Sequence, residues 1–108
     1  MTRDEFIEFC RSIPGASADK PFNGNFDSVV CRHTIGRKWF ALVMQHDGGC
    51  IVNLKCDPQE AELLRKLFTG VTPAYHMNKT HWNSVRLGSD VPDEELRRMI
   101  LSSFELTR

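Results

Sequence analysis

Three short strand-like segments separated by tight turns are the strongest constraint on the fold of this chain. Residues 28–34, 38–46 and 50–55 are rich in β-branched and apolar residues. Ile35-Gly36-Arg37 separates the first two segments, and Asp47-Gly48-Gly49 separates the last two. Because connections of this length are too short for a parallel crossover, the sequence predicts an antiparallel meander.

Helix signals lie near both ends of the chain. Thr2 and Glu5 form a capping box ahead of an apolar face, and Pro14-Gly15 ends this predicted helix. The acidic segment 89–95 predicts the start of another helix, and Leu96 is the first residue of its apolar side.

Further elements are predicted between these helices. Asp57 is the expected N-cap of a middle helix, with Pro58 in its first turn and Gly70 at its end. Residues 16–26 are typical of an extended piece that leads into a turn or loop, and residues 81–87 alternate like a strand. The order of elements predicts an α+β fold, a two-layer sandwich with helices on one face of an antiparallel sheet.

Size and composition indicate one globular domain over residues 1–108. The chain is 41% hydrophobic and 26% charged, which is typical of a soluble protein. No apolar run reaches the roughly 18 residues of a membrane helix, and the N-terminus does not resemble a signal peptide. We therefore expect a cytoplasmic monomer that does not bind membranes.

The formal net charge of zero argues against a strongly electrostatic nucleic-acid binder, but the charges are unevenly distributed. No Asp or Glu occurs from Leu63 to Ser89 or from Ser28 to His46. These segments contain Arg32, Arg37, Lys38, Arg65, Lys66, Lys79 and Arg86. They form a basic face if they share one surface; alternatively, the acids have gathered at helix N-termini for dipole reasons.

The four cysteines, Cys10, Cys31, Cys50 and Cys56, include no Cys-x-x-Cys pair. In a reducing compartment they are expected to be small buried apolar residues rather than disulfides or metal ligands. Cys31 and His33 would share one face of a strand, which suits a metal geometrically. Two ligands alone do not predict a metal site.

The segment 71–85 is the most unusual in composition. It brings stacking rings, amides and a cation together without a carboxylate: Tyr75, His76, Asn78, Lys79, His81, Trp82 and Asn83. This mixture suits binding better than catalysis. Two interpretations stay open, because the rings could be half-buried, the asparagines could cap turns and the histidines could lie at a sheet edge.

These residues resemble the MmcQ/YjbR family of small bacterial proteins along nearly the full chain. The longest match is Tyr-His-Met-Asn-Lys-x-His-Trp-Asn at residues 75–83. Supporting segments are Ile13-Pro14-Gly15-Ala16, Lys20-Pro21-Phe22, Lys38-Trp39-Phe40-Ala41-Leu42, Leu54-Lys55-Cys56-Asp57-Pro58 and Val91-Pro92-Asp93-Glu94-Glu95-Leu96. Cys31-Arg32-His33 departs from the family pattern.

The resemblance implies a two-layer fold similar to that of frataxin and its bacterial relative CyaY. It also implies DNA binding, through an expected double-wing arrangement of hairpins, and it lends no catalytic residues. The acids Asp4, Glu5 and Glu8 do not predict a frataxin-like iron site, because the helix dipole and solubility account for them. We expect no cofactor and no metal.

For DNA binding, cations would contact phosphates and rings or amides would contact bases. The candidates for phosphate contact are Arg37, Lys38, Lys79 and Arg86. The candidates for stacking are Tyr75, His76, His81 and Trp82, and Asn78 and Asn83 could reach base edges. The alternative is a non-catalytic module for a small ligand or a protein partner, since the same residues could line a pocket.

An enzyme is not predicted. His76 and His81 are five positions apart and point to different sides of a strand or helix, and no His-Glu-x-x-His motif occurs. Cys56 precedes a helix N-terminus, where a thiolate is stabilised, but a buried core cysteine explains it better.

Overall fold

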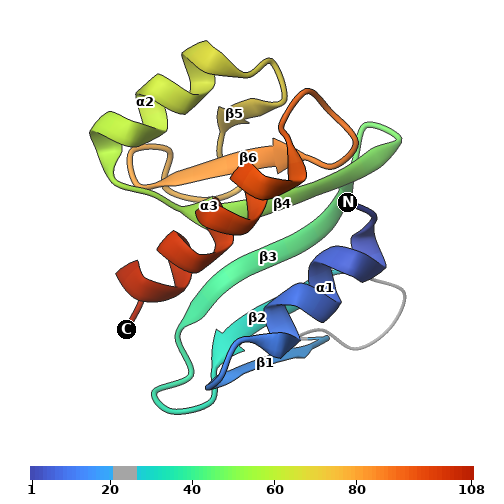
Figure 1. Ribbon diagram of the computed structural model, residues 1–108, viewed down its shortest axis with the longest axis vertical. Helices are drawn as coiled ribbons and strands as arrows, with labels where there is room; N and C mark the ends of the chain where they lie inside the picture. Colours follow the sequence, from blue (N-terminus) through green and yellow to red (C-terminus); the bar gives the residue numbers. More distant parts are fainter. Residues whose placement is uncertain (21–26) are drawn as a thin grey trace.

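The computed structural model describes residues 1–20 and 27–108, which form a six-stranded antiparallel sheet and three helices (Figure 1). The helices are α1 (Arg3–Ser12), α2 (Pro58–Leu67) and α3 (Asp93–Leu106). The strands are β1 (Ala16–Asp19), β2 (Val29–His33), β3 (Trp39–His46), β4 (Gly49–Lys55), β5 (Val71–Pro73) and β6 (Trp82–Arg86). Their order in the sheet is β1-β2-β3-β4-β6-β5.

Side-chain caps fix the start of two helices, as the sequence predicts. In the capping box of α1, the Glu5 amide donates to Thr2 Oγ1 at 3.2 Å and the Thr2 amide donates to Glu5 Oε1 at 2.8 Å. Asp57 caps α2 by accepting hydrogen bonds from the amides of Gln59 and Glu60. The N-cap of α3 is Pro92, which makes no side-chain cap.

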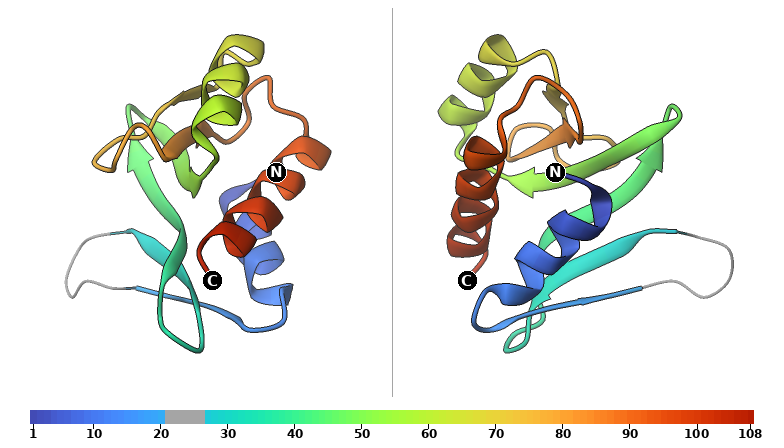
Figure 2. Two further views of the ribbon diagram at one scale, coloured as in Figure 1. Left: turned by 90° about the vertical axis from the view of Figure 1, so that its left-hand side faces the viewer. Right: turned by 45° about the vertical axis from the view of Figure 1, so that its right-hand side comes forward.

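All three helices pack on one face of the sheet, so the predicted two-layer α+β sandwich is confirmed. Figure 2 shows α1 and α3 on the same side of the strands. The core between the layers includes Phe6 of α1, Phe40 of β3, Leu64 of α2 and Ile100 of α3. Its burial supplies most of the stability of the fold. The specific likeness to frataxin stays a prediction.

The meander β2-β3-β4 is confirmed, with every neighbouring pair antiparallel. The predicted strand at 81–87 is β6, but it pairs with β4 rather than continuing the meander. Two edge strands are short: β1 forms within the segment predicted to be extended, and β5 was not predicted. The predicted turn or loop within residues 21–26 lies outside the described residues.

The four cysteines are free thiols, and Cys10, Cys31 and Cys56 are buried as expected. Cys50 is only half-buried, contrary to the expectation, because it lies at the hairpin end of β4. His33 is also buried, stacked on Phe104 with ring centroids 4.1 Å apart. Its Nε2 lies 2.9 Å from Oγ1 of Thr107. In the described part of the chain, no group of three His, Cys, Asp or Glu side chains is placed to hold a metal ion.

Within the described ranges 1–20 and 27–108, no helix combines the length and the apolar character needed to cross a membrane.

Candidate ligand-binding site

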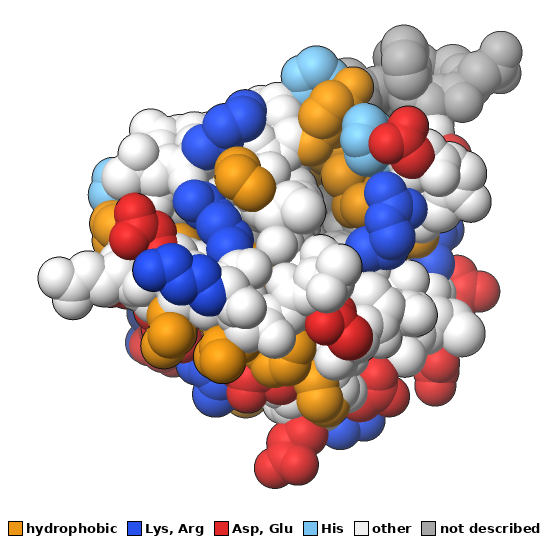
Figure 3. Space-filling view, turned by 90° about the horizontal axis from the view of Figure 1, so that it is seen from above, with side chains coloured by type: hydrophobic (Ala, Val, Ile, Leu, Met, Phe, Trp, Pro, Cys, Tyr) orange, Lys and Arg blue, Asp and Glu red, His pale blue; other side chains and the backbone are white. Residues whose placement is uncertain are grey.

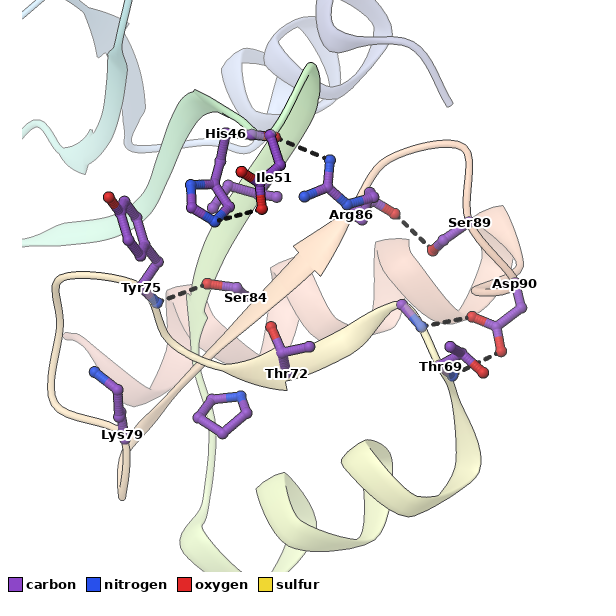
Figure 4. Close-up of a pocket in the computed structure, with 13 residues that line it drawn as sticks. His46, Ile51, Thr69, Thr72, Tyr75, Lys79, Ser84, Arg86, Ser89 and Asp90 are labelled. Atoms are coloured by element: carbon purple, nitrogen blue, oxygen red, sulfur yellow. Dashed lines mark hydrogen bonds and ion pairs between the residues drawn. The ribbon is translucent and has the colours of Figure 1, made fainter.

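The face of the sheet opposite the helices carries a cavity of about 590 Å³, which we call the outer pocket (Figure 4). The β3–β4 hairpin, β5, β6 and the segment after β6 surround it. Its lining residues are His46, Asp47, Ile51, Thr69, Gly70, Thr72, Pro73, Tyr75, Lys79, Ser84, Arg86, Ser89 and Asp90. Their mixture of rings, hydroxyls and cations is suited to binding a ligand non-covalently and fixing its orientation.

A buried hydrogen-bond network positions the aromatic side of the outer pocket. Asn53 of β4 and Ser84 of β6 are directly opposite in the sheet, and the Ser84 hydroxyl donates to Oδ1 of Asn53. The Tyr75 amide donates to Ser84 Oγ at 2.9 Å, and Asn53 Nδ2 donates to the Tyr75 carbonyl at 2.8 Å. Both backbone groups of Tyr75 are therefore held by side chains that are themselves almost fully buried.

Three rings, His46, Tyr75 and His76, form what we call the ring cluster. The Tyr75 centroid lies 4.1 Å from that of His46 and 3.9 Å from that of His76. Tyr75 is 38% exposed, so the cluster is a surface feature rather than part of the core. His76 adopts the left-handed backbone conformation, with φ of 63°, that turns the chain directly after Tyr75.

Arg86 supplies a cation at the other side of the outer pocket. Its Nη1 donates to the His46 carbonyl at 3.1 Å. Gly49 permits this approach, because a Cβ at that position would lie 2.4 Å from Nη1 of Arg86. In residues 1–20 and 27–108, neither Arg86 nor Lys79 forms an ion pair with a carboxylate.

The two acids that border the outer pocket already have partners. Asp90 accepts hydrogen bonds from the amides of Thr69 and Gly70, both at 2.8 Å, and these bonds hold the pKa of its carboxyl below the usual value. Asp47 lies 3.4 Å from Nε2 of His46. The acids therefore do not neutralise Arg86 or Lys79 directly.

The loop that carries Lys79 is tied down from α2. Arg65 Nε donates to Asn83 Oδ1 at 2.7 Å, and its Nη2 donates to the Lys79 carbonyl. Within the loop, Asn78 Oδ1 accepts hydrogen bonds from the amides of Thr80 and His81. The backbone below Lys79 is therefore fixed, whereas its exposed ammonium can reach a ligand.

Comparison with known proteins assigns the chain to a family. The YjbR family model matches residues 11–106. This chain belongs to the YjbR family. YyaQ of Bacillus subtilis is 32% identical to it over 118 residues and aligns with 100% of this chain and 99% of its own length. YbdF of Escherichia coli O157:H7 is 38% identical over 101 residues, which are 94% of this chain and 72% of that relative.

Solved structures show the same YjbR-type fold. The crystal structure of a Pseudomonas syringae protein superimposes with a TM-score of 0.90 at 35% identity and covers 100% of both chains. The crystal structure of a Deinococcus radiodurans protein with domain DUF419 gives a TM-score of 0.83 at 29% identity, over 97% of this chain and 77% of that one. The resemblance stated from the sequence is thus confirmed at the level of family and fold.

The sequence-predicted binding residues of this YjbR-family chain separate into groups. Tyr75, Lys79 and Arg86 line the outer pocket, and His76 adjoins it. His81 is exposed at the end of the loop that carries Lys79, and Trp82 is the half-buried first residue of β6. Figure 3 shows histidine, hydrophobic, basic and acidic side chains around a hollow in the view from above.

Asparagines 78 and 83 have structural roles in the described chain. Asn78 closes the turn before β6, and Asn83 is 3% exposed with its amide bonded to Arg65 and to the Ala61 carbonyl. Asn83 is therefore not available to a base edge without unfolding of the loop.

Arg37 and Lys38 are exposed on the connection between β2 and β3. This connection lies at the lower end of the molecule in Figure 1, whereas the outer pocket lies among the upper strands. The structure therefore does not join these two cations to the surface around Tyr75. Arg37 and Lys38 therefore do not share one basic face with Lys79 and Arg86.

The sequence did not identify His46, Thr72 or Ser84 as part of a site. His46 ends a strand whose pattern indicates only packing, and its contact with Tyr75 spans the sheet from β3 to the loop before β6. The available signal was the absence of acids, since His46 ends one acid-free segment and Arg86 lies near the end of the other.

Cys56 does not have the properties of an activated nucleophile. Burial, reinforced by the nearby Glu60 carboxylate, raises the pKa of its thiol to about 11. At neutral pH the thiol is thus protonated, and Cys56 is the buried core cysteine that the sequence analysis favoured.

Proposed function

We propose that this YjbR-family protein is a non-catalytic DNA-binding module that contacts a single strand through the outer pocket and its rim. The observation that supports the proposal is the placement of the ring cluster beside Lys79 and Arg86, two cations without carboxylate partners in the described chain. Rings that stack on bases and cations that meet phosphates are the two components of single-strand recognition.

The neutral total charge sets the expected mode of binding. With a net charge of zero, the protein lacks the long-range attraction of a basic DNA-binding protein. Affinity must then come from local contacts at the outer pocket, so stacking should contribute as much as phosphate pairing. This predicts weaker salt dependence than that of a protein with many phosphate contacts.

The test is a fluorescence-anisotropy titration of a labelled oligonucleotide with wild-type protein and charge variants. Lys79→Gln and Arg86→Gln should each weaken binding across sequences and reduce the slope of log affinity against log salt by about 0.7, the value for one single-strand phosphate contact. Arg37→Gln and Lys38→Gln are matched controls on the distant β2–β3 connection. Equal losses in all four variants would contradict the assigned surface.

A free small molecule is the second candidate ligand, because the cavity volume of about 590 Å³ lies within the range of about 300–1,000 Å³ typical of small-molecule sites. A thermal-shift screen of small anionic and aromatic compounds tests this function. A stabilising compound should lose its effect in the Tyr75→Ala variant but keep it in Arg37→Gln.

A further inference from the structure

We propose that the outer pocket accommodates one nucleoside 5′-monophosphate unit, with the phosphate at Arg86 and the base against the ring cluster. The inference deepens the proposed DNA binding and rests on it. The unit can come from a free nucleotide or from a nucleotide within a single strand, and Lys79 separates these two sources.

Arg86 has the geometry of a phosphate-binding group. Its Nη1 is fixed by the His46 carbonyl and packs against Gly49, so the planar guanidinium has a defined orientation. A guanidinium has five N–H donors, and the described residues use Nη1 for that single contact. The remaining donors can form the paired hydrogen bonds that a phosphate accepts from arginine.

The ring cluster has the geometry of a base-binding platform. Hydrogen bonds at 2.9 and 2.8 Å hold the amide and carbonyl of Tyr75, so its ring is presented by a rigid backbone. His46 lies between Tyr75 and the β3–β4 turn, and its carbonyl is the group that orients Arg86 (Figure 4). Base platform and phosphate donor are therefore linked through one residue and are preorganised together.

The size of the outer pocket favours one unpaired nucleotide over a duplex. A cavity of about 590 Å³ is of the small-molecule class, and the base of an intact pair cannot enter it. A strand that is already single avoids the cost of unpairing and pays only for unstacking. The inferred ligand is thus a nucleotide unit of single-stranded DNA or the equivalent free nucleotide.

Lys79 lies across the outer pocket from Arg86 (Figure 4). A nucleotide whose own phosphate is at Arg86 leaves the exposed Lys79 ammonium free for the phosphate of the adjoining nucleotide. Loss of Lys79 should therefore weaken the binding of an oligonucleotide more than that of a mononucleotide. Loss of Arg86 should weaken both.

The first experiment uses wild-type protein and follows amide chemical shifts in titrations with dAMP, deoxyadenosine and inorganic phosphate. We expect dAMP to bind at least tenfold more tightly than either fragment and to shift the amides of His46, Gly49 and Arg86. Arg37 serves as the distant reference amide and should not shift. Equal affinity for dAMP and deoxyadenosine, or shifts spread over the whole protein, would overturn the inference.

The second experiment compares Arg86→Lys with Arg37→Lys. Both substitutions keep the positive charge and remove the planar guanidinium with its paired N–H donors. The Arg86 variant should lose at least fivefold in dAMP affinity with deoxyadenosine binding unchanged, and the Arg37 variant should lose nothing. Unchanged dAMP affinity in a folded Arg86→Lys protein would overturn the phosphate assignment.

The same titrations with a labelled dA hexamer separate this inference from the proposed function. Hexamer binding without dAMP binding would overturn the single-nucleotide site and leave DNA binding intact. Binding of dAMP without hexamer binding would overturn DNA binding and support a free-nucleotide site. Absence of both would overturn both.

Discussion

Arg65 of α2 and Asn83 of β6 form a side-chain hydrogen bond of 2.7 Å from the Nε of Arg65 to the Oδ1 of Asn83. The same guanidinium donates to the backbone carbonyl of Lys79 and, at 3.5 Å, to that of Trp82. The other half of the Asn83 amide donates to the Ala61 carbonyl at 3.3 Å. These bonds connect α2 with the loop that precedes β6, on which the proposed contact with DNA depends.

Replacing Arg65 should therefore destabilise the protein and loosen this loop. Arg65→Met keeps much of the apolar stem but leaves the buried side-chain oxygen of Asn83 without its partner, so we expect a loss of about 2 kcal/mol in the free energy of unfolding. Lys66→Met, at the exposed neighbouring position, should change it by less than about 0.5 kcal/mol.

Urea unfolding measures the stability of both variants, and amide hydrogen exchange of residues 79–83 measures the loop. Faster exchange in Arg65→Met alone is the expected result. If both variants unfolded like wild type, the Arg65 hydrogen bonds would make no net contribution to the free energy of unfolding.

Ser84→Ala tests the network below the ring cluster. The substitution removes the donor to Asn53 Oδ1 and the acceptor for the Tyr75 amide. Both Ser84 and Asn53 are buried, with exposed fractions of 3% and 0%. Buried groups left unsatisfied cost about 1–3 kcal/mol, and the Tyr75 ring should become more mobile. Calorimetry and tyrosine fluorescence anisotropy check these two effects. Ser17→Ala on the edge strand β1, at a half-buried position, is the matched control and should be nearly neutral.

Asp90 gives a stability contribution that depends on pH. Hydrogen bonds from Gly70 and Thr69 lower the pKa of its carboxyl in the folded protein below the unfolded value of about 4. The contribution is present above the unfolded pKa and is lost as the pH falls through the folded pKa. Asp90→Ala should therefore lower the melting temperature at pH 7, and the difference from wild type should shrink as the pH falls below the unfolded pKa.

Melting curves from pH 2 to pH 7 measure this difference for Asp90→Ala. Glu62→Ala, on the exposed face of α2, is the control and should follow wild type at each pH. A constant difference between Asp90→Ala and wild type over the whole range would show that protonation of Asp90 is not involved.

The cysteines should differ in reactivity. Burial raises the pKa of Cys56 to about 11, so its thiolate is scarce at pH 8. Cys50 also has a raised pKa through burial, but it is only half-buried and should be alkylated first by iodoacetamide. Mass spectrometry of partly modified protein identifies the order, and Cys50→Ser should remove the fastest step. Fast modification of Cys56 would contradict the assigned environment.

The sequence predicts those elements whose signals are local. The capping box of Thr2 and Glu5 and the N-cap at Asp57 each act within one helical turn, and both are present in the structure. The meander follows from turn chemistry between β2, β3 and β4. The strand β5 has only three residues, Val71–Pro73, and forms because β6 offers an edge, which no local pattern indicates.

The candidate site was only partly predictable, because long-range contacts decide which polar residues are free. Nothing in the sequence around Asn83 separates it from the other polar residues of the segment, but its side-chain amide is hydrogen-bonded to Arg65 and to the Ala61 carbonyl. His46 joins the site through a ring contact with Tyr75, 29 positions later in the chain. Arg37 and Lys38 belong to a separate hairpin, and composition alone does not show that the sheet places them far from the outer pocket.

The most direct test of the central claim is an anisotropy titration of single- and double-stranded DNA at two salt concentrations. We predict that single-stranded DNA binds more tightly than duplex, that its affinity falls modestly with salt, and that Tyr75→Leu weakens binding at both concentrations. No binding of single-stranded DNA at low salt would contradict the account, as would duplex binding that Tyr75→Leu leaves unchanged.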